Sequence, residues 1–269
     1  MFKIVFSDID GTLLNAERNL SEYTIETIKK LSKCDIPFIL ISSRMPAAMR
    51  HLQEKMDITH LPIISYNGGL ILVNGKTVSS TEIPIEILAQ LSDFNIEPDV
   101  HLSLFHNDEW YVPRDDFWTR REINNTKVNP EITTNKEVIE KWKNENKGAH
   151  KIMAMGDEEN IDRIRDFLIE NFAGKLHLYR SKPSYLEIAP RSISKLTAVE
   201  HLLDNHFKLP LSQSVAYGDN YNDIEMLKGV GMGIAVGNAK PEVLEIAHKI
   251  TTPGKEDGVA KSLSELLEI

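Results

Sequence analysis

The sequence predicts an α/β protein: a doubly wound, Rossmann-like core of parallel strands that is interrupted by an inserted α+β segment. Three observations lead to this fold class. Short apolar strands alternate with amphipathic helices at both ends of the chain, and these strands are continuous apolar runs. The middle of the chain instead combines strands of alternating polarity with helices. Continuous apolar strands are typical of a sheet that helices cover on both faces.

The first third of the chain is expected to alternate strand and helix. Ser21 is suited to cap the first helix, and Ile25, Ile28 and Leu31 recur on one helical face. Pro46 suits an early position of the second helix. The expected elements are a strand over residues 4–6, a helix over about 21–33, a strand over 36–41, a helix over 46–56 and a strand over 63–65.

The last third repeats this pattern. Its expected elements are a strand over 185–189, helices over about 196–205, 223–227, 241–247 and 258–267, and strands over 214–217 and 233–235. The middle holds all three tryptophans, alternating strands over 101–105 and 151–155, a helix near 158–171 and a polar segment, 124–135, that is expected to be a loop. The predicted core therefore comprises residues 1–79 and 187–269, and the insertion comprises residues 80–186.

Composition narrows the class of protein. The 269 residues carry a formal net charge of −9, from 31 Lys and Arg against 40 Asp and Glu, which disfavours a general nucleic-acid binder. No apolar stretch approaches ~18 residues, so no transmembrane helix is expected, and the N-terminus does not have the pattern of a signal peptide. A cytoplasmic protein is the expectation. Cys34 is the single cysteine, so an internal disulfide is excluded, and its thiol is expected to be packed.

The first strand delivers two carboxylates, Asp8 and Asp10, into a turn at Gly11. Residues two apart on a strand point to the same side, so both carboxylates would share one small site. Two close carboxylates need a proton or a cation between them, and a hard ion such as Mg2+ meets that need. The alternative is a strand-end aspartate beside an Asx turn, which has no catalytic meaning.

Polar residues follow three other predicted strands as well. Ligands of an open parallel sheet bind beyond the carboxyl ends of the strands, so these residues are expected to converge on one rim. They are Ser42-Ser43-Arg44, Tyr66-Asn67-Gly68-Gly69 and Gly218-Asp219-Asn220-Tyr221-Asn222-Asp223.

Taken together, these motifs resemble the haloacid dehalogenase (HAD) superfamily of phosphohydrolases, and within it the Cof-type branch with a large α+β (type IIB) cap inserted mid-chain. The resemblance covers the full length. It runs from Asp8-Ile9-Asp10-Gly11-Thr12 through Gly218-Asp219-x-x-Asn222-Asp223 to Gly233-Ile234-Ala235-Val236-Gly237-Asn238-Ala239 and Glu256-Asp257-Gly258-Val259-Ala260. It implies that the insertion is the cap, which covers the site and selects the substrate.

The resemblance also implies roles for single residues. Asp8 matches the nucleophile and Asp10 the general acid/base. Lys195 matches the lysine that offsets the charge of the nucleophile and of the phosphoryl group. Ser42 matches the hydroxyl that donates to that group, and Arg44 is a further candidate for substrate binding.

The implied metal ligands are Asp8, the backbone carbonyl of Asp10, and Asp219, with Asp223 holding a metal-bound water or orienting Lys195. The remaining phosphate-binding candidates are Ser43, Asn67, Gly68 and Asn222. Ser43 and Leu196 stand where the family usually has glycine, so Ser43 would have to tolerate a glycine-like backbone. Cap candidates for substrate contact are His106, Trp110, Arg180, Lys182 and Tyr185.

The resulting expectation is a Mg2+-dependent phosphatase that hydrolyses small phosphomonoesters, such as sugar or cofactor phosphates, through an aspartyl-phosphate. Its partner would be a small-molecule phosphate ester, with no nucleic acid or membrane, and the oligomeric state is not readable from the sequence. Two alternatives stay open. One is a phosphomutase or phosphotransferase with the same nucleophile, and the other is a catalytically idle phospho-ligand sensor on the same fold.

Overall fold

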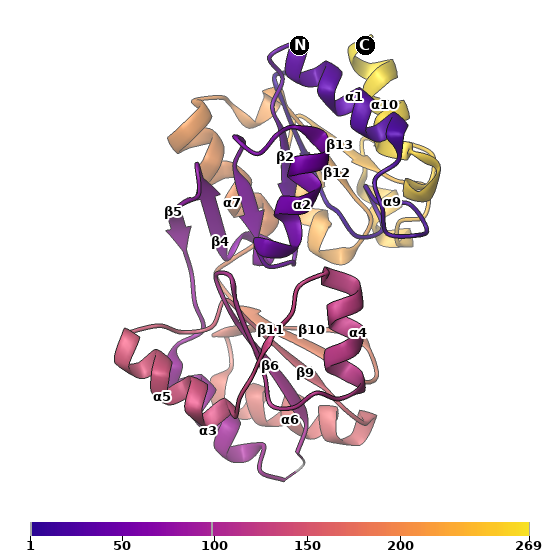
Figure 1. The fold of residues 1–269 in the computed structure, drawn as a ribbon. Coiled ribbons are helices and arrows are strands. Elements are labelled where there is room, and N and C mark those ends of the chain that lie inside the picture. Colours follow the sequence, from indigo (N-terminus) through magenta and orange to yellow (C-terminus); the bar gives the residue numbers. More distant parts are fainter. Residues whose placement is uncertain (1, 98, 269) are drawn as a thin grey trace. The chain divides into compact units, whose positions relative to one another are not determined.

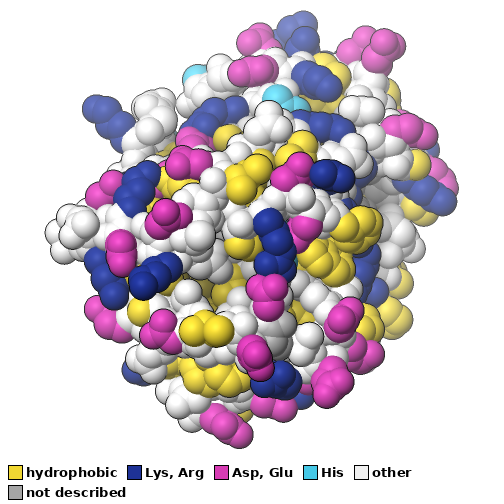
Figure 2. All heavy atoms as spheres, turned by 60° about the horizontal axis from the view of Figure 1, so that its bottom comes forward, with side chains coloured by type: hydrophobic (Ala, Val, Ile, Leu, Met, Phe, Trp, Pro, Cys, Tyr) yellow, Lys and Arg dark blue, Asp and Glu magenta, His cyan; other side chains and the backbone are white. Residues whose placement is uncertain are grey.

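The chain leaves its first compact unit after Ser79 and returns to it at Ser194; the second unit is Ser80–Ile193. Figure 1 shows the computed structural model, which describes residues 2–97 and 99–268. None of the helices in these residues combines the length and the apolarity that crossing a membrane requires. On the face drawn in Figure 2, acidic and basic side chains lie interspersed rather than gathered by sign.

The first unit is built on an eight-stranded sheet of order β14-β13-β12-β1-β2-β3-β4-β5. Strands β14 to β3 in this order are parallel, and β4 turns back antiparallel to β3. The strands are β1 Ile4–Ser7, β2 Phe38–Ile41, β3 Ile63–Ser65, β4 Leu70–Val73, β5 Lys76–Ser80, β12 Ser214–Gly218, β13 Met232–Ala235 and β14 Lys249–Ile250. The predicted α/β class and parallel core are thereby confirmed.

Both faces of the central strands are buried, which explains their continuous apolar sequence. Ile4 and Phe6 of β1 join a core with residues of α7 and α8, whereas Val5 between them is equally buried. Helix α1 packs against α10, α2 and β2. The helices of this unit are α1 Glu22–Lys33, α2 Ala47–Met56, α7 Lys195–Leu202, α8 Ile224–Gly229, α9 Pro241–Ile246 and α10 Gly258–Leu267.

The second unit carries a six-stranded sheet of order β10-β11-β9-β6-β7-β8, in which only the β7–β8 pair is parallel. Its strands are β6 His101–His106, β7 Glu109–Val112, β8 Glu131–Ile132, β9 Lys151–Met155, β10 Leu176–Lys182 and β11 Tyr185–Pro190. Helices α3 Ile85–Phe94, α5 Asn135–Glu145 and α6 Glu158–Phe172 share one apolar core with this sheet, and α4 is Phe117–Thr126.

Three details of the sequence analysis need correction. The insertion extends to Ile193 rather than to residue 186, because β11 pairs with β9 and β10 of the second unit. Residues 124–135 are not one loop, since α4 continues to Thr126 and β8 lies within the segment. Cys34 is exposed, because it is the C-cap residue of α1 rather than part of its buried face.

Candidate active site

The strands that carry the predicted site residues are neighbours in the first unit. β12, β1, β2 and β3 are adjacent and parallel, so their carboxyl ends meet at one edge of the sheet. The loops that leave this edge hold Asp8 and Asp10, Ser42 to Arg44, Asn67 and Gly68, and Asp219 to Asp223. This is the edge at which ligands bind in open α/β sheets.

The centre of the site is a buried lysine between two carboxylates. Lys195 Nζ lies 2.6 Å from Asp8 Oδ1 and 2.6 Å from Asp223 Oδ1, and its side chain is 0% exposed. Burial by itself opposes the charged ammonium, but Asp223 and Asp8 together raise the pKa of Lys195 above its usual value. Burial raises the pKa of Asp8 well above its usual range, although Lys195 counteracts this.

Asp219 completes a group of three carboxylates. Its Oδ1 accepts a hydrogen bond from Thr12 Oγ1 at 2.9 Å. Burial, together with the nearby charge of Asp223, raises the pKa of Asp219 to about 6. Gly11 makes room for this carboxylate, because a Cβ at that position would lie 2.4 Å from Asp219 Oδ2.

Asp223 holds the turn after β12 in place. Its Oδ2 accepts from the backbone N–H groups of Asp219 at 2.9 Å and Asn220 at 3.0 Å, while its Oδ1 faces Lys195. The oxygen of Asp223 that faces the turn, Oδ2, therefore accepts two hydrogen bonds from the turn's backbone. This geometry suits a residue that orients Lys195 and Asp219.

The three carboxylates form a donor set that fits a hard divalent cation. One ligand oxygen from each of Asp8, Asp219 and Asp223 lies within 4.8 Å of the others. Among the described residues, Lys195 is the ammonium group that pairs with these carboxylates, and it contacts Asp8 and Asp223; a cation bound beside the three carboxylates would relieve the remaining repulsion. The side chain of Asp10 lies outside this group; the predicted ligand there is its backbone carbonyl.

The carboxylate of Asp10 instead accepts hydrogen bonds from two guanidinium groups. Arg44 donates from Nε to Oδ2 at 2.7 Å and from Nη2 to Oδ1 at 2.8 Å, and Arg18 Nη2 donates to Oδ1 at 2.6 Å. Burial would raise the pKa of Asp10, but hydrogen bonds and charge from Arg44, together with the charge of Arg18, lower it. Sequence reasoning gave no role to Arg18 or Thr12; Thr12 adjoins the Gly11 turn, but no motif marks Arg18.

The remaining predicted phosphate-binding residues are linked by backbone and side-chain hydrogen bonds. Ser42 Oγ accepts from the N–H of Arg44 at 3.2 Å, and the carbonyl of Ser42 accepts from the N–H of Asn67 at 2.9 Å. Asn222 Nδ2 donates to Asn67 Oδ1 at 2.9 Å. The structure thus brings the ends of β2, β3 and β12 together as the sequence analysis expects.

Two departures from the family pattern are accommodated. Ser43 does not adopt a positive φ, so the predicted strain at this position is absent. Leu196 finds space because Gly229 lacks a side chain: a Cβ there would lie 2.5 Å from Leu196 Cδ1. Gly68 has φ +102°, and a Cβ would lie 2.5 Å from the carbonyl oxygen of Ser194, so glycine is required at this position.

Two of the predicted cap contacts have partners within the second unit. Arg180 pairs with Asp162 and donates to the carbonyl of Pro183 at 2.8 Å. Trp110 is buried and stacks on Phe105 with ring centroids 5.6 Å apart. Both interactions suit a structural role.

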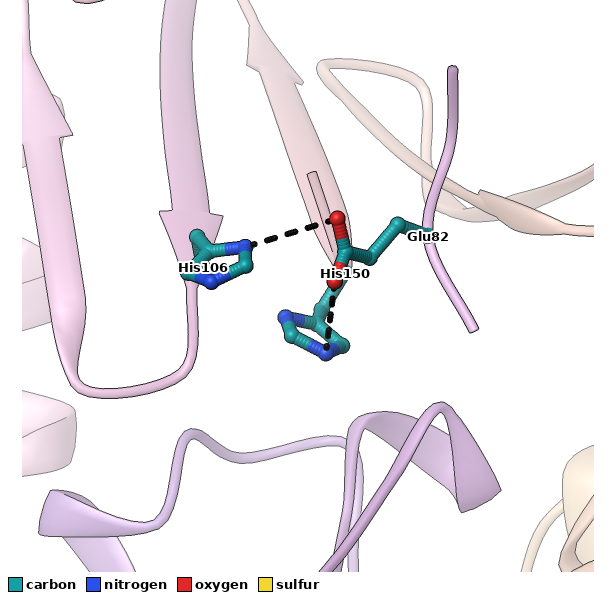
Figure 3. A group of neighbouring side chains, drawn as sticks. All are labelled: Glu82, His106 and His150. Carbon is teal, nitrogen blue, oxygen red and sulfur yellow. Dashed lines mark ion pairs between the residues drawn. The ribbon is translucent and has the colours of Figure 1, made fainter. Parts of the chain in front are cut away.

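Figure 3 shows the other group of possible metal ligands in the described residues, Glu82, His106 and His150. The N–H of Asn107 donates to His150 Nδ1 at 3.1 Å, so a neutral His150 carries its proton on Nε2 and offers no lone pair there. Ser80 Oγ lies 3.0 Å from that Nε2 and 2.9 Å from Glu82 Oε1. We interpret Glu82, His106 and His150, together with Ser80, as a hydrogen-bonded cluster that stabilises the start of the second unit.

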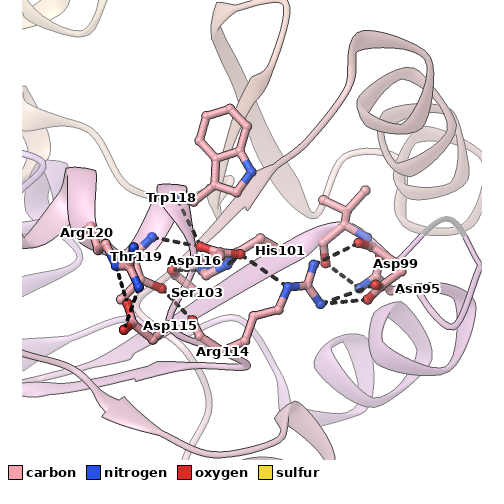
Figure 4. A network of polar contacts seen from close by, with 11 residues as sticks. Asn95, Asp99, His101, Ser103, Arg114, Asp115, Asp116, Trp118, Thr119 and Arg120 are labelled. Carbon is pink, nitrogen blue, oxygen red and sulfur yellow. Dashed lines mark hydrogen bonds and ion pairs between the residues drawn. The ribbon is translucent and has the colours of Figure 1, made fainter.

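Figure 4 shows a network at the start of α4 in which three residues have the connectivity of a hydrolase triad. His101 Nδ1 lies 2.8 Å from Asp116 Oδ2, and His101 Nε2 lies 3.1 Å from Ser103 Oγ. Ser103 is 0% and His101 1% exposed, so no substrate could reach the hydroxyl. The network is structural: Asp116 caps α4 through the N–H groups of Trp118 and Thr119.

Comparisons with known proteins were made on the whole chain. Residues 5–263 match the family model for haloacid dehalogenase-like hydrolases. The chain is 33% identical to a putative phosphatase of Haemophilus influenzae over 98% of both chains. It is 28% identical to the 5-amino-6-(5-phospho-D-ribitylamino)uracil phosphatase YitU of Bacillus subtilis, over 99% of this chain and 98% of that one.

A solved structure has the same fold. The crystal structure of a haloacid dehalogenase-like hydrolase from Bacteroides thetaiotaomicron superimposes with a TM-score of 0.89 at 26% identity, covering 99% of this chain and 100% of that one. Both units are therefore included in the similarity.

Proposed function

The chain belongs to the haloacid dehalogenase-like hydrolase family and is a phosphatase, and on that premise we propose that it hydrolyses small phosphomonoesters through an aspartyl-phosphate on Asp8, with Mg2+ as cofactor. The buried pairing of Lys195 with Asp8 carries this proposal. One oxygen of Asp8 is fixed by Lys195, so the other is held in a defined direction for attack on phosphorus.

In the first step, the free carboxylate oxygen of Asp8 forms a bond to phosphorus while the bond from phosphorus to the ester oxygen breaks. The electron pair of that bond stays on the ester oxygen, which takes a proton from Asp10 and departs as an alcohol. Asp10 has to release guanidinium donors and bind this proton before it can deliver it. Lys195 and the hydroxyl of Ser42 stabilise the negative charge of the phosphoryl oxygens.

In the second step, Asp10 accepts a proton from a water molecule whose oxygen attacks the same phosphorus. The bond between phosphorus and Asp8 breaks, the carboxylate is restored and inorganic phosphate leaves. Asp8, Asp219 and the carbonyl of Asp10 would hold Mg2+, which when bound supplies positive charge that draws in the phosphoryl group and offsets its charge.

We further propose that the second unit, Ser80–Ile193, is the cap that selects the substrate, and that the core carries the chemistry. All of the predicted catalytic and metal-binding residues belong to the first unit. A division of this kind leaves the second unit free to determine which leaving group is accepted.

The test measures release of inorganic phosphate from a panel of small phosphomonoesters, with Mg2+ or with EDTA. We expect Mg2+-dependent turnover that Asp8→Asn lowers by at least about 10^3-fold, because the nucleophile is lost. Asp166→Asn is the matched control, since Asp166 is exposed and pairs only with Arg165 in the described residues.

Turnover that survives Asp8→Asn contradicts the assignment of the nucleophile. Phosphate that appears on a second hydroxyl compound instead of free in solution identifies a phosphotransferase. Binding of an ester without any product identifies the idle sensor.

A further inference from the structure

A tyrosine at the start of β11 has a buried hydroxyl without a partner. Tyr185 is 6% exposed, and its hydroxyl forms no hydrogen bond with any described residue. Two other buried side-chain atoms of the described residues are in the same position, Trp110 Nε1 and Asn135 Oδ1. Buried polar groups nearly always have partners, because leaving one unpaired is costly. The hydroxyl of Tyr185 is therefore placed for an acceptor that the chain itself does not supply.

Two cations lie against the ring of Tyr185. The guanidinium carbon of Arg121, on α4, lies 5.0 Å from the ring centroid, and Nζ of Lys182, at the end of β10, lies 5.8 Å from it. Trp118, one helical turn before Arg121, meets the same ring edge-on with centroids 5.3 Å apart. Figure 4 shows the indole of Trp118 pointing away from the hydrogen-bonded network at the start of α4. An indole and two cations thus gather around Tyr185.

Neither cation has an acid as its partner. In the described part of the chain, the side chains of Arg121 and Lys182 form no ion pair and no hydrogen bond, and each has its ring contact with Tyr185. Glu122 acts on Tyr185 through its charge, but its Oε1 accepts from Asn125 Nδ2 at 3.2 Å. A guanidinium that only stacks on a ring keeps its N–H groups available to an added anion.

The groups around the hydroxyl are hydrogen-bond donors. Burial, with the charge of Glu122 as a further cause, raises the pKa of Tyr185 to about 12 although Arg121 opposes this, so the hydroxyl keeps its proton at neutral pH. Arginine and lysine side chains donate and never accept. Such a set suits a carboxylate: its two oxygens match two N–H groups of one guanidinium, and one of them can also accept from a hydroxyl.

We propose that Arg121, Lys182 and Tyr185 form a carboxylate subsite, so that the preferred substrates are phosphomonoesters of hydroxy acids. The inference rests on the proposed function and deepens it, since the second unit is the part that selects the leaving group. A substrate of this class carries one phosphate for the chemistry at Asp8 and one carboxylate for the subsite. The bond that breaks is the same bond from phosphorus to the ester oxygen, and the products are inorganic phosphate and the hydroxy acid.

Binding tests the subsite without turnover. Matched pairs of phosphomonoesters, in which a carboxylate replaces a terminal CH2OH group, are titrated calorimetrically into Asp8→Asn protein with Mg2+ present. The three-carbon pair is 3-phosphoglycerate and glycerol 3-phosphate, and the six-carbon pair is 6-phosphogluconate and sorbitol 6-phosphate. Two lengths are used because the subsite defines the terminal group of the substrate and not the length of the chain that carries it.

We expect the acid of at least one pair to bind at least about tenfold more tightly than its alcohol, the effect of one charge-assisted contact. Arg121→Gln on the same background is expected to abolish this preference and to leave the affinity for the alcohol unchanged. Arg121→Lys should restore part of the preference, because it keeps the charge without the fork.

Tyr185→Phe should reduce the preference about threefold, the effect of one hydrogen bond, without lowering stability in urea, because the hydroxyl has no partner to lose. Arg120→Gln is the matched control. Arg120 lies on the same helix, is exposed and pairs with Asp115, so its loss removes the same charge and should change neither affinity.

The proposal is overturned if neither acid binds better than its alcohol, or if Arg121→Gln weakens acid and alcohol equally. It is also overturned if Arg120→Gln lowers the preference as much as Arg121→Gln does. A less stable Tyr185→Phe protein with an unchanged preference removes the hydroxyl from the subsite.

Turnover of the same four compounds by protein with Asp8 intact tests the proposed function separately. Binding that depends on Arg121 without any turnover refutes the hydrolysis but not the subsite. Turnover without a preference for either acid refutes the subsite alone.

Discussion

Lys195 shows how one side chain can serve both stability and chemistry. Its ammonium group is fully buried and touches two carboxylates, Asp8 and Asp223. Burying a charge is costly unless partners with good geometry compensate it. The same positive charge that permits these carboxylates to lie together would meet the phosphoryl oxygens of a substrate.

Lys195→Met is expected to lower the free energy of unfolding by about 3 kcal/mol in EDTA, because two buried carboxylates lose their counter-charge. Mg2+ should restore part of this loss if it binds the same carboxylates. Urea unfolding with and without Mg2+ measures both effects. Lys249→Met, at an exposed lysine that pairs with Glu265, is the control. Equal stability of wild type and Lys195→Met in EDTA would contradict the argument.

For single residues, the sequence motifs predicted where the acids lie but not which side chains form hydrogen bonds with Asp10. Asp8, Asp219 and Asp223 come together as expected because strand order fixes the ends of β1 and β12 side by side. Arg18 could not be predicted, since its approach to Asp10 depends on the path of an irregular loop and on no periodic pattern.

Among the elements, the turn after β1 leaves no space for a side chain at Gly11. Gly11 has φ +89°, in the left-handed region where other residues are strained, and its missing Cβ leaves space for Asp219. The turn therefore couples the position of Asp10 to that of Asp219, the proposed metal ligand that follows β12.

Gly11→Ala is expected to lower kcat/KM by about tenfold or more and to raise the Mg2+ concentration needed for half-maximal activity, because the new methyl group displaces Asp219. Gly75→Ala is a matched control: Gly75 has φ +71° in the same unit but open space around its Cβ position. Both variants carry backbone strain, so only a difference between them reports the contact with Asp219. Identical Mg2+ dependence of the two would refute the coupling.

Element prediction succeeded where burial is two-sided or helical periodicity is strong. The helices at 22–33 and 258–267 and the parallel strands β1, β2, β3, β12 and β13 lie close to where the sequence places them, whereas the two-residue strand β14 is not among the predicted elements. Prediction failed over 124–135, because α4 ends and β8 begins within polar residues whose structure depends on neighbours such as β7. Local sequence carries little information about such edge elements.

For the molecule as a whole, the buried side chain of His150 is expected to make the free energy of unfolding depend on pH. Burial, with the charge of His106 as a second cause, lowers the pKa of His150 to about 4. An unfolded histidine binds its proton near 6.5, so between about pH 6.5 and 4 the unfolded state holds more protons than the folded state. Stability is therefore expected to fall as the pH falls through this range.

His150→Gln should reduce that slope by up to about 1.4 kcal/mol per pH unit while also lowering stability at pH 7, where hydrogen bonds to Asn107 and Ser80 are lost. Urea midpoints between pH 7.5 and 4.5 measure the slope. His60→Gln, at an exposed histidine, is the control. A variant with the wild-type slope would show that another group controls the acid response.

The order of strands in the first unit also bears on how the molecule is made. β1 lies between β2 and β12, and Ile4 pairs in register with Ser214. During synthesis on the ribosome, β1 can pair with its second neighbour only after residues 214–218 have been translated, when Ser80–Ile193 is already complete. The inserted unit can fold first, and the core becomes competent only when the last strands arrive, so protein truncated before β12 should expose an unpaired edge of β1 and depend on chaperones.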